Sequence, residues 1–575
     1  MKFSFATERV GGACGEALAR PAAHIVVLII GAAFLLTDAF HGNIWFDESY
    51  SVAIAAHSFG DIWYIGSGDV HPVLFYWALH ILYLVFGQNV LVYRLFTVAG
   101  AVALATLGFT HVRRDFGWKV GLLFSFFALF TPYISIMAVE VRMYSWATFT
   151  VTACFIYAWR IIREIHGGGR VRCHWWALFF LASLASAYLH YFGVLSAFMV
   201  NVILLGYLAG HAVRARRPRA DRDRDRRVAR VSLAAFAVSA VAQVALYLPW
   251  LAVLASQMGV VSQTYWANIV FPTTFIELAT YPIMTSPISF AVRGNYGLGW
   301  EIALYALWGI AVVLVAVLAV AAARGATARS RQGEDSAAGG AAKRFATTWR
   351  FRSWPMDVRA MAAALGVYLG VYAIALAASV AMNSLILYYR YLFIAIGPLL
   401  LAMAIALSHV RSNVVLGGLC AVLFSVSVIN QALLVSDDYD GRNDEPLAYL
   451  DEKVESLKEE TGIENPLVTS TDIGFMGPVM VRYPQIQQVY MDWQKGNWDR
   501  AYLCYAPSIT SQKSWESIFD GFTGKFILLG QSQTEATPRD ISDLSNKQGF
   551  VLLSTKTFYR PYERTWFTVA VMEKY

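Results

Sequence analysis

The stretch from His24 to Phe40 reads HIVVLIIGAAFLLTDAF and carries a single charged side chain. An apolar run of about this length can cross the roughly 30 Å of hydrocarbon in a bilayer as a helix. No small-x-small cleavage site follows it, and many further apolar blocks do. We therefore interpret it as an uncleaved first membrane span rather than a signal peptide.

The rest of the chain repeats this pattern. Of its 575 residues, 57% are apolar and 15% are charged, against roughly 45–50% apolar in a soluble domain even when Gly is counted. A water-soluble protein could not bury so much apolar surface. The apolar blocks predict a polytopic α-helical membrane protein with about eleven spans, near residues 23–40, 91–112, 119–138, 146–162, 175–190, 192–211, 231–254, 299–323, 359–382, 391–408 and 414–435.

One apolar segment, His71 to Phe86, is left out of this count. It has 16 residues, which is short for a span. Counting it would place Arg113, Arg114 and the arginine-rich loop at Arg214–Arg230 outside, against the rule that basic loops stay in the cytoplasm. We predict that it lies along the outer interface as an amphipathic or re-entrant helix.

The net charge of +7 does not indicate nucleic-acid binding, because its distribution follows the topology instead. Nine arginines lie between Arg214 and Arg230, and a second basic stretch runs from Arg324 to Trp354. Each separates two apolar blocks, as expected for cytoplasmic loops beside anionic lipid headgroups. The pattern predicts a multi-pass plasma-membrane protein whose N-terminus is inside, with membrane lipid as a partner and no nucleic acid.

The composition becomes polar near Ser436, and we expect residues 436–575 to form one extracytoplasmic α/β domain after a membrane domain at 1–435. Asp451–Glu460 favours a helix, and short strands are expected at Leu467–Ser470, Lys525–Leu529 and Trp566–Met572. The five cysteines, Cys14, Cys154, Cys173, Cys420 and Cys504, form no CxxC pair. A structural disulfide or a cysteine-based zinc site is therefore not expected.

The predicted topology brings unusual polar residues to one membrane face, in outer loops at 41–90, 139–145 and 255–298 or at the ends of spans. A large outer-face cavity follows from this convergence. The residues are Asp47, Glu48, Asp69, His71, Glu140, Arg142, Tyr144, His190, Tyr191 and the run Tyr388–Tyr391.

Most of these residues also have a structural explanation. Asp47 could N-cap a short helix, Glu140 and Arg142 could form an ion pair, and His190 could belong to an interfacial belt. Arg390 is harder to explain in this way, because it lies at the outer mouth of a span, against the positive-inside trend. A guanidinium held there suggests a buried carboxylate or phosphate partner.

Several of these motifs resemble the GT-C membrane glycosyltransferases, in particular the family 39-like branch of protein O-mannosyltransferases and the lipid A aminoarabinose transferase. The resemblance rests on the first outer loop, the second-loop acid and a late Arg-Tyr element, and it covers roughly residues 20–435. The matching segments are Trp45–Tyr50, Asp69–Tyr76 with Gly87, Glu140–Tyr144, and Tyr389–Tyr391 with Pro398.

This resemblance implies transfer of a sugar from a polyprenyl-phosphate donor to an acceptor hydroxyl outside the membrane, usually with inversion. The acceptor would be a glycolipid, a wall polymer or a protein. Asp47 is the candidate base, with Glu48 and Glu140 as further catalytic acids. Arg390 and then Arg142 are the candidates for the donor phosphate. The candidates for substrate binding are His71, Tyr144, His190, Tyr191 and Tyr391.

The sequence departs from the family pattern in two places: His71-Pro72-Val73 replaces His-Pro-Pro, and Glu140 stands where relatives often have Asp. These departures leave the donor sugar and the role of Glu140 open. The branch implies no cofactor and a metal-independent reaction, although Asp47, Glu48 and Glu140 could supply oxygen ligands to a divalent cation.

Two alternatives remain open from the sequence. A transporter or lipid flippase would also have many spans, but it would place ionisable residues near mid-membrane and often in related halves. A noncatalytic member would use the same fold to bind a partner or wall polymer. Turnover of a lipid-linked sugar separates both from an enzyme.

Overall fold

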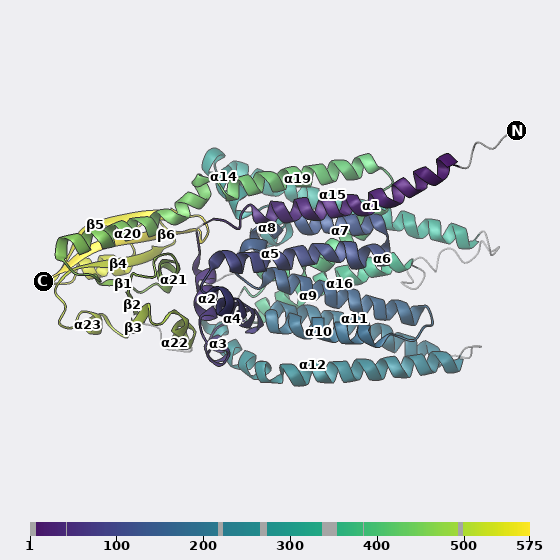
Figure 1. The fold of residues 1–575 in the computed structure, drawn as a ribbon, viewed down its shortest axis with the longest axis horizontal. Helices are drawn as coiled ribbons and strands as arrows, with labels where there is room; N and C mark the ends of the chain where they lie inside the picture. Colours follow the sequence, from purple (N-terminus) through teal and green to yellow (C-terminus); the bar gives the residue numbers. More distant parts are fainter. Residues whose placement is uncertain are drawn as a thin grey trace.

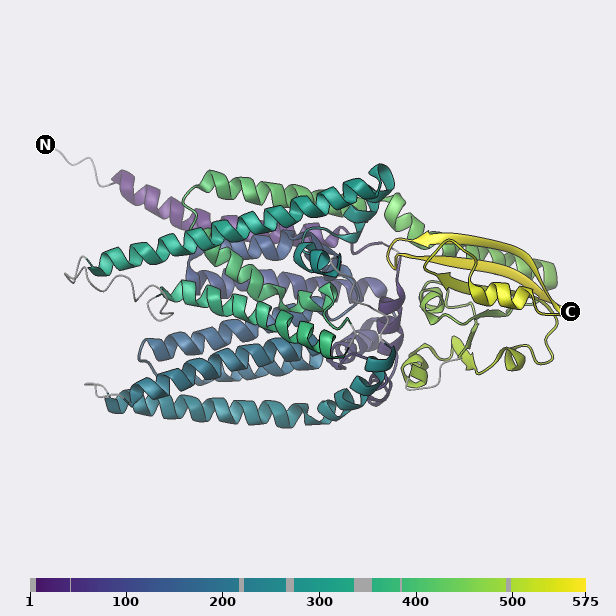
Figure 2. The same cartoon turned by 180° about the vertical axis from the view of Figure 1, so that it is seen from behind.

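The computed structural model describes residues 7–41, 43–216, 222–264, 273–335, 354–382, 385–492 and 498–575. The molecule is elongated, with long helices running side by side along its length and a small sheet domain at one end (Figures 1 and 2). This arrangement of a helical bundle followed by a C-terminal α/β region confirms the predicted fold class. Parts of the predicted basic stretch Arg324–Trp354, of the arginine-rich loop and of outer loop 255–298 lie outside the described residues.

The bundle helices coincide with the eleven apolar blocks of the sequence. Helix α5 continues beyond Leu107 through a π-helical turn, Gly108–Val112, into the short helix α6, Arg113–Phe116. The bundle helices are α1 (Thr7–Leu36), α5 (Val90–Leu107), α7 (Trp118–Phe130), α8 (Pro132–Val139), α9 (Tyr144–His166), α10 (Cys173–Leu189), α11 (Tyr191–Ala215), α12 (Arg222–Thr264), α15 (Leu298–Asp335), α16 (Met356–Ala381), α18 (Ile396–Ser408) and α19 (Asn413–Leu434).

Seven helices in the described part of the chain are long and apolar enough to cross a membrane, or up to eight if a bent pair counts as one span. The expected count of about eleven spans is higher, because the helices at three of the expected spans are too short or too polar to be counted here. The apolar part of α1, Pro21–Leu36, and the 17-residue α10 are shorter apolar helices. The 23-residue α9 is long enough but carries several Ser, Thr and charged side chains.

The expected third span, near 119–138, is not one straight helix. It breaks at Thr131 into α7 and α8, whose axes differ by 62°. Pro132 explains the break, because its ring removes a backbone N–H and disfavours helical backbone in the preceding residue. Thr131 is accordingly extended, with φ −74° and ψ 123°.

Three short helices lie at the end of the bundle nearest the sheet domain (Figure 1): α2 (Phe46–Ala55), α3 (Phe59–Gly66) and α4 (Leu74–Phe86). The last of these is the apolar segment that the topology argument excluded from the spans. It has 13 residues and is too short to cross the membrane. It packs against α2, α3, α5 and α10.

The C-terminal region contains a six-stranded sheet in the order β3-β2-β1-β4-β6-β5. The first four strands are mutually parallel, and β6 pairs antiparallel with β4 and β5. Its strands are β1 (Val468–Ser470), β2 (Gln488–Met491), β3 (Ile509–Gln512), β4 (Gly524–Ser532), β5 (Phe550–Arg560) and β6 (Thr565–Lys574). Its helices are α20 (Arg442–Thr461), α21 (Ile473–Arg482), α22 (Trp498–Ala501), α23 (Trp515–Ile518) and α24 (Arg539–Ser545).

The sheet domain contacts the bundle through α21, which packs on α2. The approach is close at Gly477, where an added Cβ would lie 2.4 Å from Ser49 Oγ. Ser49 Oγ also lies 3.2 Å from the Tyr505 hydroxyl, and His57 Nε2 lies 3.0 Å from the Cys504 carbonyl. The domain therefore packs directly on the helix that carries Asp47 and Glu48.

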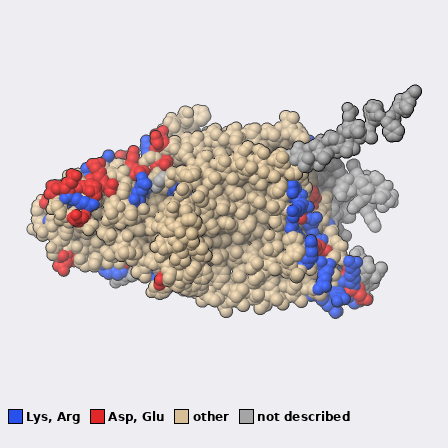
Figure 3. All heavy atoms as spheres, in the orientation of Figure 1, with Lys and Arg blue, Asp and Glu red and all other residues tan. Residues whose placement is uncertain are grey.

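Charge divides the surface into three zones (Figure 3). Lys and Arg form a band at the end of the bundle remote from the sheet domain, the middle is almost free of charge, and most acidic side chains lie on the sheet domain. An uncharged belt of long apolar helices is what a bilayer requires. The chain is a multi-pass membrane protein.

Candidate active site

Asp47, Glu140 and Arg390 come together where α2 meets the bundle. Asp47 lies in the first turn of α2, where the helix dipole favours a carboxylate, and Trp45 rather than Asp47 occupies the N-cap. Arg390 lies on α17 (Tyr389–Leu392), at the start of the span that continues through α18. Its Nη1 is 3.1 Å from Asp47 Oδ2 and 3.4 Å from Glu140 Oε1. Segments more than 300 residues apart thus meet in one ion-paired group.

The guanidinium of Arg390 also stacks over the indole of Trp45, 4.2 Å from the ring centroid. A cation over an indole face is held in place by the ring quadrupole. The Arg390 and Asp47 side chains are 17% and 29% exposed, whereas Glu140 is 7% exposed. Asp47 and Arg390 therefore remain partly accessible, while Glu140 supports them from within.

Glu48 faces a different set of partners. Its Oε1 accepts a hydrogen bond of 2.9 Å from the backbone N–H of Val141, and its Oε2 lies 3.6 Å from Arg94 Nη2. Arg94, which is 1% exposed, also donates to the carbonyls of His41 and Asn43. Both oxygens of Glu48 are engaged in joining α2, α5 and the segment after α8.

Arg142 lies behind Asp47 and is 3% exposed. Its Nη1 donates to the Asp47 carbonyl at 3.2 Å and to the Tyr76 hydroxyl at 3.3 Å, and its Nη2 is 3.2 Å from His71 Nδ1. His71 Nδ1 is in turn 3.4 Å from Asp69 Oδ2. Arg142 thus contacts the backbone of Asp47, whereas the side chain of Asp47 faces Arg390.

The predicted substrate-binding residues fall into two groups. His190 is the hub of the first: its ring centroid lies 5.3 Å from that of His71, 5.8 Å from that of Tyr144 and 5.3 Å from that of Tyr391. Tyr191 belongs elsewhere, because its hydroxyl binds Gln257 and accepts from Trp250 Nε1. Four of the five residues therefore form one buried cluster that reaches Arg142 through His71.

A cavity of about 590 Å³, part of it open to solvent, lies beside Glu140 and Arg390. Glu48, Glu140 and Arg390 border it together with aromatic and apolar side chains of the bundle. The lining residues are Asp38, His41, Trp45, Glu48, Tyr133, Ile136, Met137, Val139, Glu140, Ser286, Tyr389, Arg390, Leu434, Tyr439 and Tyr562. Asp47, Arg142 and the cluster around His190 are not among them, and Asp47 reaches the cavity through its contact with Arg390.

A second cavity of about 280 Å³ adjoins the first, since Tyr133, Ser286 and Tyr389 line both. Its other residues come from α13 (Thr273–Thr280), the turn between α13 and α14 (Ser286–Tyr296), α15 and the C-terminal domain. They are Glu277, Tyr281, Met284, Thr285, Tyr305 and Arg564. The two cavities together form a polar, tyrosine-rich recess at the end of the bundle nearest the sheet domain.

The turn between β5 and β6 contributes residues that the sequence analysis did not identify. Tyr562 lines the first cavity and Arg564 the second. Arg560 fixes the turn: it is fully buried, donates to the Ile44 carbonyl at 2.8 Å, and lies 3.1 Å from Glu563. The run Arg560-Pro-Tyr-Glu-Arg564 is rich in charged and aromatic side chains, which could have marked it as a candidate from the sequence. No sequence pattern, however, places it against a loop more than 500 residues earlier.

Arg564 differs from Arg390 in its partners. Its Nη2 donates to Ser286 Oγ at 2.9 Å, and among the described residues no carboxylate lies within ion-pair distance of it. It is exposed to the cavity and adopts φ +53°, a conformation uncommon for a residue with a side chain. The recess thus holds one guanidinium neutralised by carboxylates and one that is not.

Burial sets the protonation of the acidic and imidazole groups. It raises the pKa of Glu140 to about 7, outweighing the opposing effect of Arg390. Burial, followed by the charge of Arg142, lowers the pKa of His71, and burial lowers that of His190 well below its usual value. Both imidazoles are therefore neutral at pH 7, and Glu140 is poised between its two forms.

Within the described ranges, no three His, Cys, Asp or Glu side chains are gathered as ligands for a metal ion. Asp47 and Glu140 both face Arg390, and Glu48 faces Arg94.

A scan of protein-family models and a search of curated proteins gave no match to this chain. Among solved structures it is similar to crystal structures of ArnT from Cupriavidus metallidurans. With apo ArnT the identity is 13% and the TM-score 0.44, over 97% of this chain and 98% of ArnT. With ArnT bound to undecaprenyl phosphate the identity is 14% and the TM-score 0.40, again over 97% and 98%. The likeness is one of overall architecture.

Proposed function

We propose that this protein transfers a sugar from a polyprenyl-phosphate donor to a hydroxyl of an acceptor, at the end of the bundle that carries the sheet domain. The observation that carries the proposal is the contact of 3.1 Å between Asp47 and Arg390 beside a partly open recess. A base and a fixed cation in one site are the two groups that displacement of a lipid phosphate requires. The motif resemblance to GT-C glycosyltransferases adds independent support.

In the proposed reaction, Asp47 accepts the proton of the acceptor hydroxyl as its oxygen attacks the anomeric carbon. The bond between that carbon and the phosphate oxygen breaks on the opposite face, so the configuration inverts. The electron pair remains on the phosphate, and Arg390 stabilises the developing charge. Arg564 reaches the adjoining cavity from the other side and is suited to hold the same phosphate.

The remaining predicted residues take supporting roles in this proposal. Arg142 holds the backbone of Asp47, and Glu48 ties α2 to Arg94. Glu140 shares Arg390 with Asp47 and sets how much of its charge is available to the donor. His71, Tyr144, His190 and Tyr391 shape the wall behind Asp47, and Tyr191 supports α12 through Gln257.

We place the recess on the outer side of the plasma membrane and the N-terminus inside. The band of Lys and Arg at the opposite end supports this orientation, since basic residues favour the cytoplasmic side (Figure 3). The sheet domain would then brace the outer loops and line the route of the acceptor, which is a glycolipid, a wall polymer or a protein. The reaction is proposed to be metal-independent, so chelator should leave it unchanged; a loss of turnover restored by manganese would argue otherwise.

The decisive experiment measures sugar release from radiolabelled polyprenyl-phosphate sugars by the purified protein in lipid nanodiscs. Asp47→Asn should lower turnover by about 10²–10⁴-fold while donor binding is retained. Arg390→Ala should lower both the turnover and the affinity for the donor. Asp61→Asn is the matched control, because Asp61 is exposed on α3 and its carboxylate accepts a hydrogen bond from Ser58, the N-cap of that helix.

Other outcomes point to the alternatives. Movement of the intact lipid across the bilayer without sugar release would indicate a flippase. Donor or polymer binding that is equal in wild type and Asp47→Asn, with no release by either, would indicate a noncatalytic binding protein. Equal turnover in both would show that Asp47 is not the base.

A further inference from the structure

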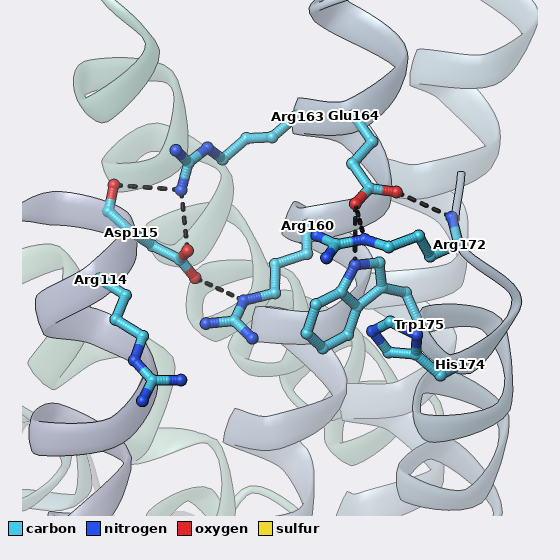
Figure 4. A pocket seen from close by; sticks show the side chains of 8 residues that line it. All are labelled: Arg114, Asp115, Arg160, Arg163, Glu164, Arg172, His174 and Trp175. Carbon is cyan, nitrogen blue, oxygen red and sulfur yellow. Dashed lines mark hydrogen bonds and ion pairs between the residues drawn. The ribbon is translucent and has the colours of Figure 1, made fainter. Parts of the chain in front are cut away.

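A third and larger cavity lies at the end of the bundle remote from the sheet domain, outside the site described above. Its volume is about 960 Å³, part of it open to solvent. Its walls come from α6, the last turns of α9 and the start of α10 (Figure 4). It plays no part in the proposed transfer, because it occupies the opposite pole of the molecule from Asp47.

Positive charge is in excess in this cavity, which is lined by four arginines and two carboxylates. Asp115 is shared by Arg160 and Arg163, each at 2.8 Å. Glu164 pairs with Arg172 at 2.6 Å. Each carboxylate is thus already engaged, and one of them balances two guanidinium groups.

Arg114 is the fourth arginine, and its guanidinium extends toward the same space (Figure 4). Within the described part of the chain it has no ion pair or side-chain hydrogen bond, whereas its neighbour Asp115 has two arginine partners. The cavity therefore presents a guanidinium that can still take an anion.

The indole of Trp175 positions two of the other three arginines. The guanidinium carbons of Arg160 and Arg172 lie 4.6 Å and 5.1 Å from the ring centroid of Trp175. The indole N–H of Trp175 donates to Glu164 at 3.0 Å. Guanidinium groups held on a ring lose little entropy when they bind a planar or tetrahedral oxyanion.

Membrane topology alone does not explain this arrangement. Arginines that only retain a loop in the cytoplasm need no more than contact with water and headgroups. Here the Arg160 and Asp115 side chains are only 10% and 9% exposed. This buried pair fixes the wall of the cavity, whereas the excess positive charge lies on side chains that stay accessible to an anion: Arg163 is 40% exposed, Arg172 is 63% exposed and Arg114 is exposed as well.

We propose that this cavity binds the phosphate of an anionic lipid headgroup in the adjacent leaflet. Tetrahedral phosphate oxygens suit several guanidinium donors at once. Trp175 lies in the first turn of α10, at the boundary of the apolar belt, where tryptophan prefers the headgroup layer. The class of ligand is a phosphate-bearing anion, and the position at the membrane boundary favours a lipid over a soluble phosphate.

Native mass spectrometry of the full chain released from nanodiscs tests this proposal. The nanodiscs contain phosphatidylcholine doped with phosphatidic acid or phosphatidylglycerol. Wild type should retain the anionic lipid preferentially, and Arg114→Gln should weaken that retention by roughly tenfold, as expected for loss of one charge-assisted hydrogen bond. Arg114 is exposed, so its replacement should leave the fold intact, which a thermal melt verifies.

Arg411→Gln is the matched control, because Arg411 is exposed between α18 and α19 and does not line the cavity. Its retention of anionic lipid should equal that of wild type. Equal retention of phosphatidylcholine and phosphatidic acid, or equal losses in the two variants, would overturn the proposal. Stabilisation by inorganic phosphate without any preference among lipids would overturn the assignment to a lipid.

Discussion

Glu140 competes with any bound anion for the guanidinium of Arg390. Its carboxylate lies 3.4 Å from Arg390 Nη1, and burial raises its pKa to about 7. Below that pH the carboxyl group of Glu140 is neutral, and a donor phosphate shares the charge of Arg390 with Asp47 alone. Above it, the carboxylate and the phosphate repel one another, so binding a donor requires uptake of a proton.

We expect donor affinity in wild type to fall as pH rises through 7, because the ionised form of Glu140 disfavours the phosphate. One linked proton limits the change to about tenfold per pH unit. Glu140→Gln mimics the protonated form and should bind the donor with nearly constant affinity from pH 6 to 8. Titration of a polyprenyl-phosphate sugar by intrinsic fluorescence at each pH measures this, because a phosphate diester lacks the second ionisation at about pH 6 that a phosphate monoester has. Parallel pH profiles in the two proteins would exclude Glu140 as the group responsible.

At the scale of elements, the contact between α2 and α5 depends on one buried ion pair. Arg94 is 1% exposed and Glu48 is 3% exposed. Removing one partner of a buried pair leaves an uncompensated charge, at a cost of about 3–5 kcal/mol. This contact keeps the first turn of α2, and with it Asp47, against the bundle.

Arg94→Met should therefore lower the thermal unfolding temperature markedly, and adding Glu48→Gln should recover part of the loss because the unpaired charge is gone. Melting curves of the purified proteins in detergent provide the measurement. Arg163→Met is a suitable comparison, since Arg163 is 40% exposed and exposed pairs contribute about 0–1 kcal/mol. Equal shifts for both single variants would mean that the buried pair is not important for stability.

The turn between β5 and β6 places Arg564 in the second cavity, where we expect it to bind the donor phosphate. Arg564→Ala should raise the donor KM by roughly tenfold, since a charge-assisted hydrogen bond to phosphate contributes about 1.5–3 kcal/mol. The donor KM of Arg564→Lys should lie between those of wild type and Arg564→Ala, because lysine keeps the charge and loses the bidentate geometry. Arg539→Ala, at an exposed site on the same domain, serves as the control. An unchanged KM in Arg564→Ala would remove this turn from the donor site.

The elements that the sequence predicted are those with a strong local signal. The helix at 451–460 and the strands at 525–529 and 566–572 fall within α20, β4 and β6, and the strand at 467–470 begins one residue before β1 and ends with it. The strands β2 and β3 have four residues each, too few for a hydrophobic period to stand out. The bend at Pro132 was missed because an apolar composition extends through it, although proline in such a run is a known breaking signal.

For the whole molecule, the orientation in the membrane is the prediction with the widest consequences. A variant that keeps Cys173 as its one cysteine should react with an impermeant maleimide only from the cytoplasmic side, because Cys173 is exposed at the basic end of the bundle. A cysteine-free variant with Ala536→Cys, exposed on the sheet domain, should react only from outside. Labelling of intact cells and inverted vesicles tests both. The reverse pattern would place the recess on the cytoplasmic side.

The sequence also predicted which loops contribute polar residues, but not how these residues pair. Charge asymmetry between loops is enough to assign Asp47, Glu140 and Arg390 to one end of the bundle. Two features depend on tertiary packing that no local pattern encodes: the placement of Arg142 behind Asp47, and the insertion of Tyr562 and Arg564 from the sheet domain.

The insertion of Tyr562 and Arg564 from the sheet domain also determines when the recess is completed during synthesis. Translation proceeds from the N-terminus, so Asp47 is synthesised more than 500 residues before Tyr562 and Arg564. Until the β5–β6 hairpin has folded and Arg560 has docked on Ile44, the recess lacks one wall. A partly synthesised or prematurely truncated chain therefore cannot present a finished pocket to lipid-linked substrates, however completely its helices have been inserted.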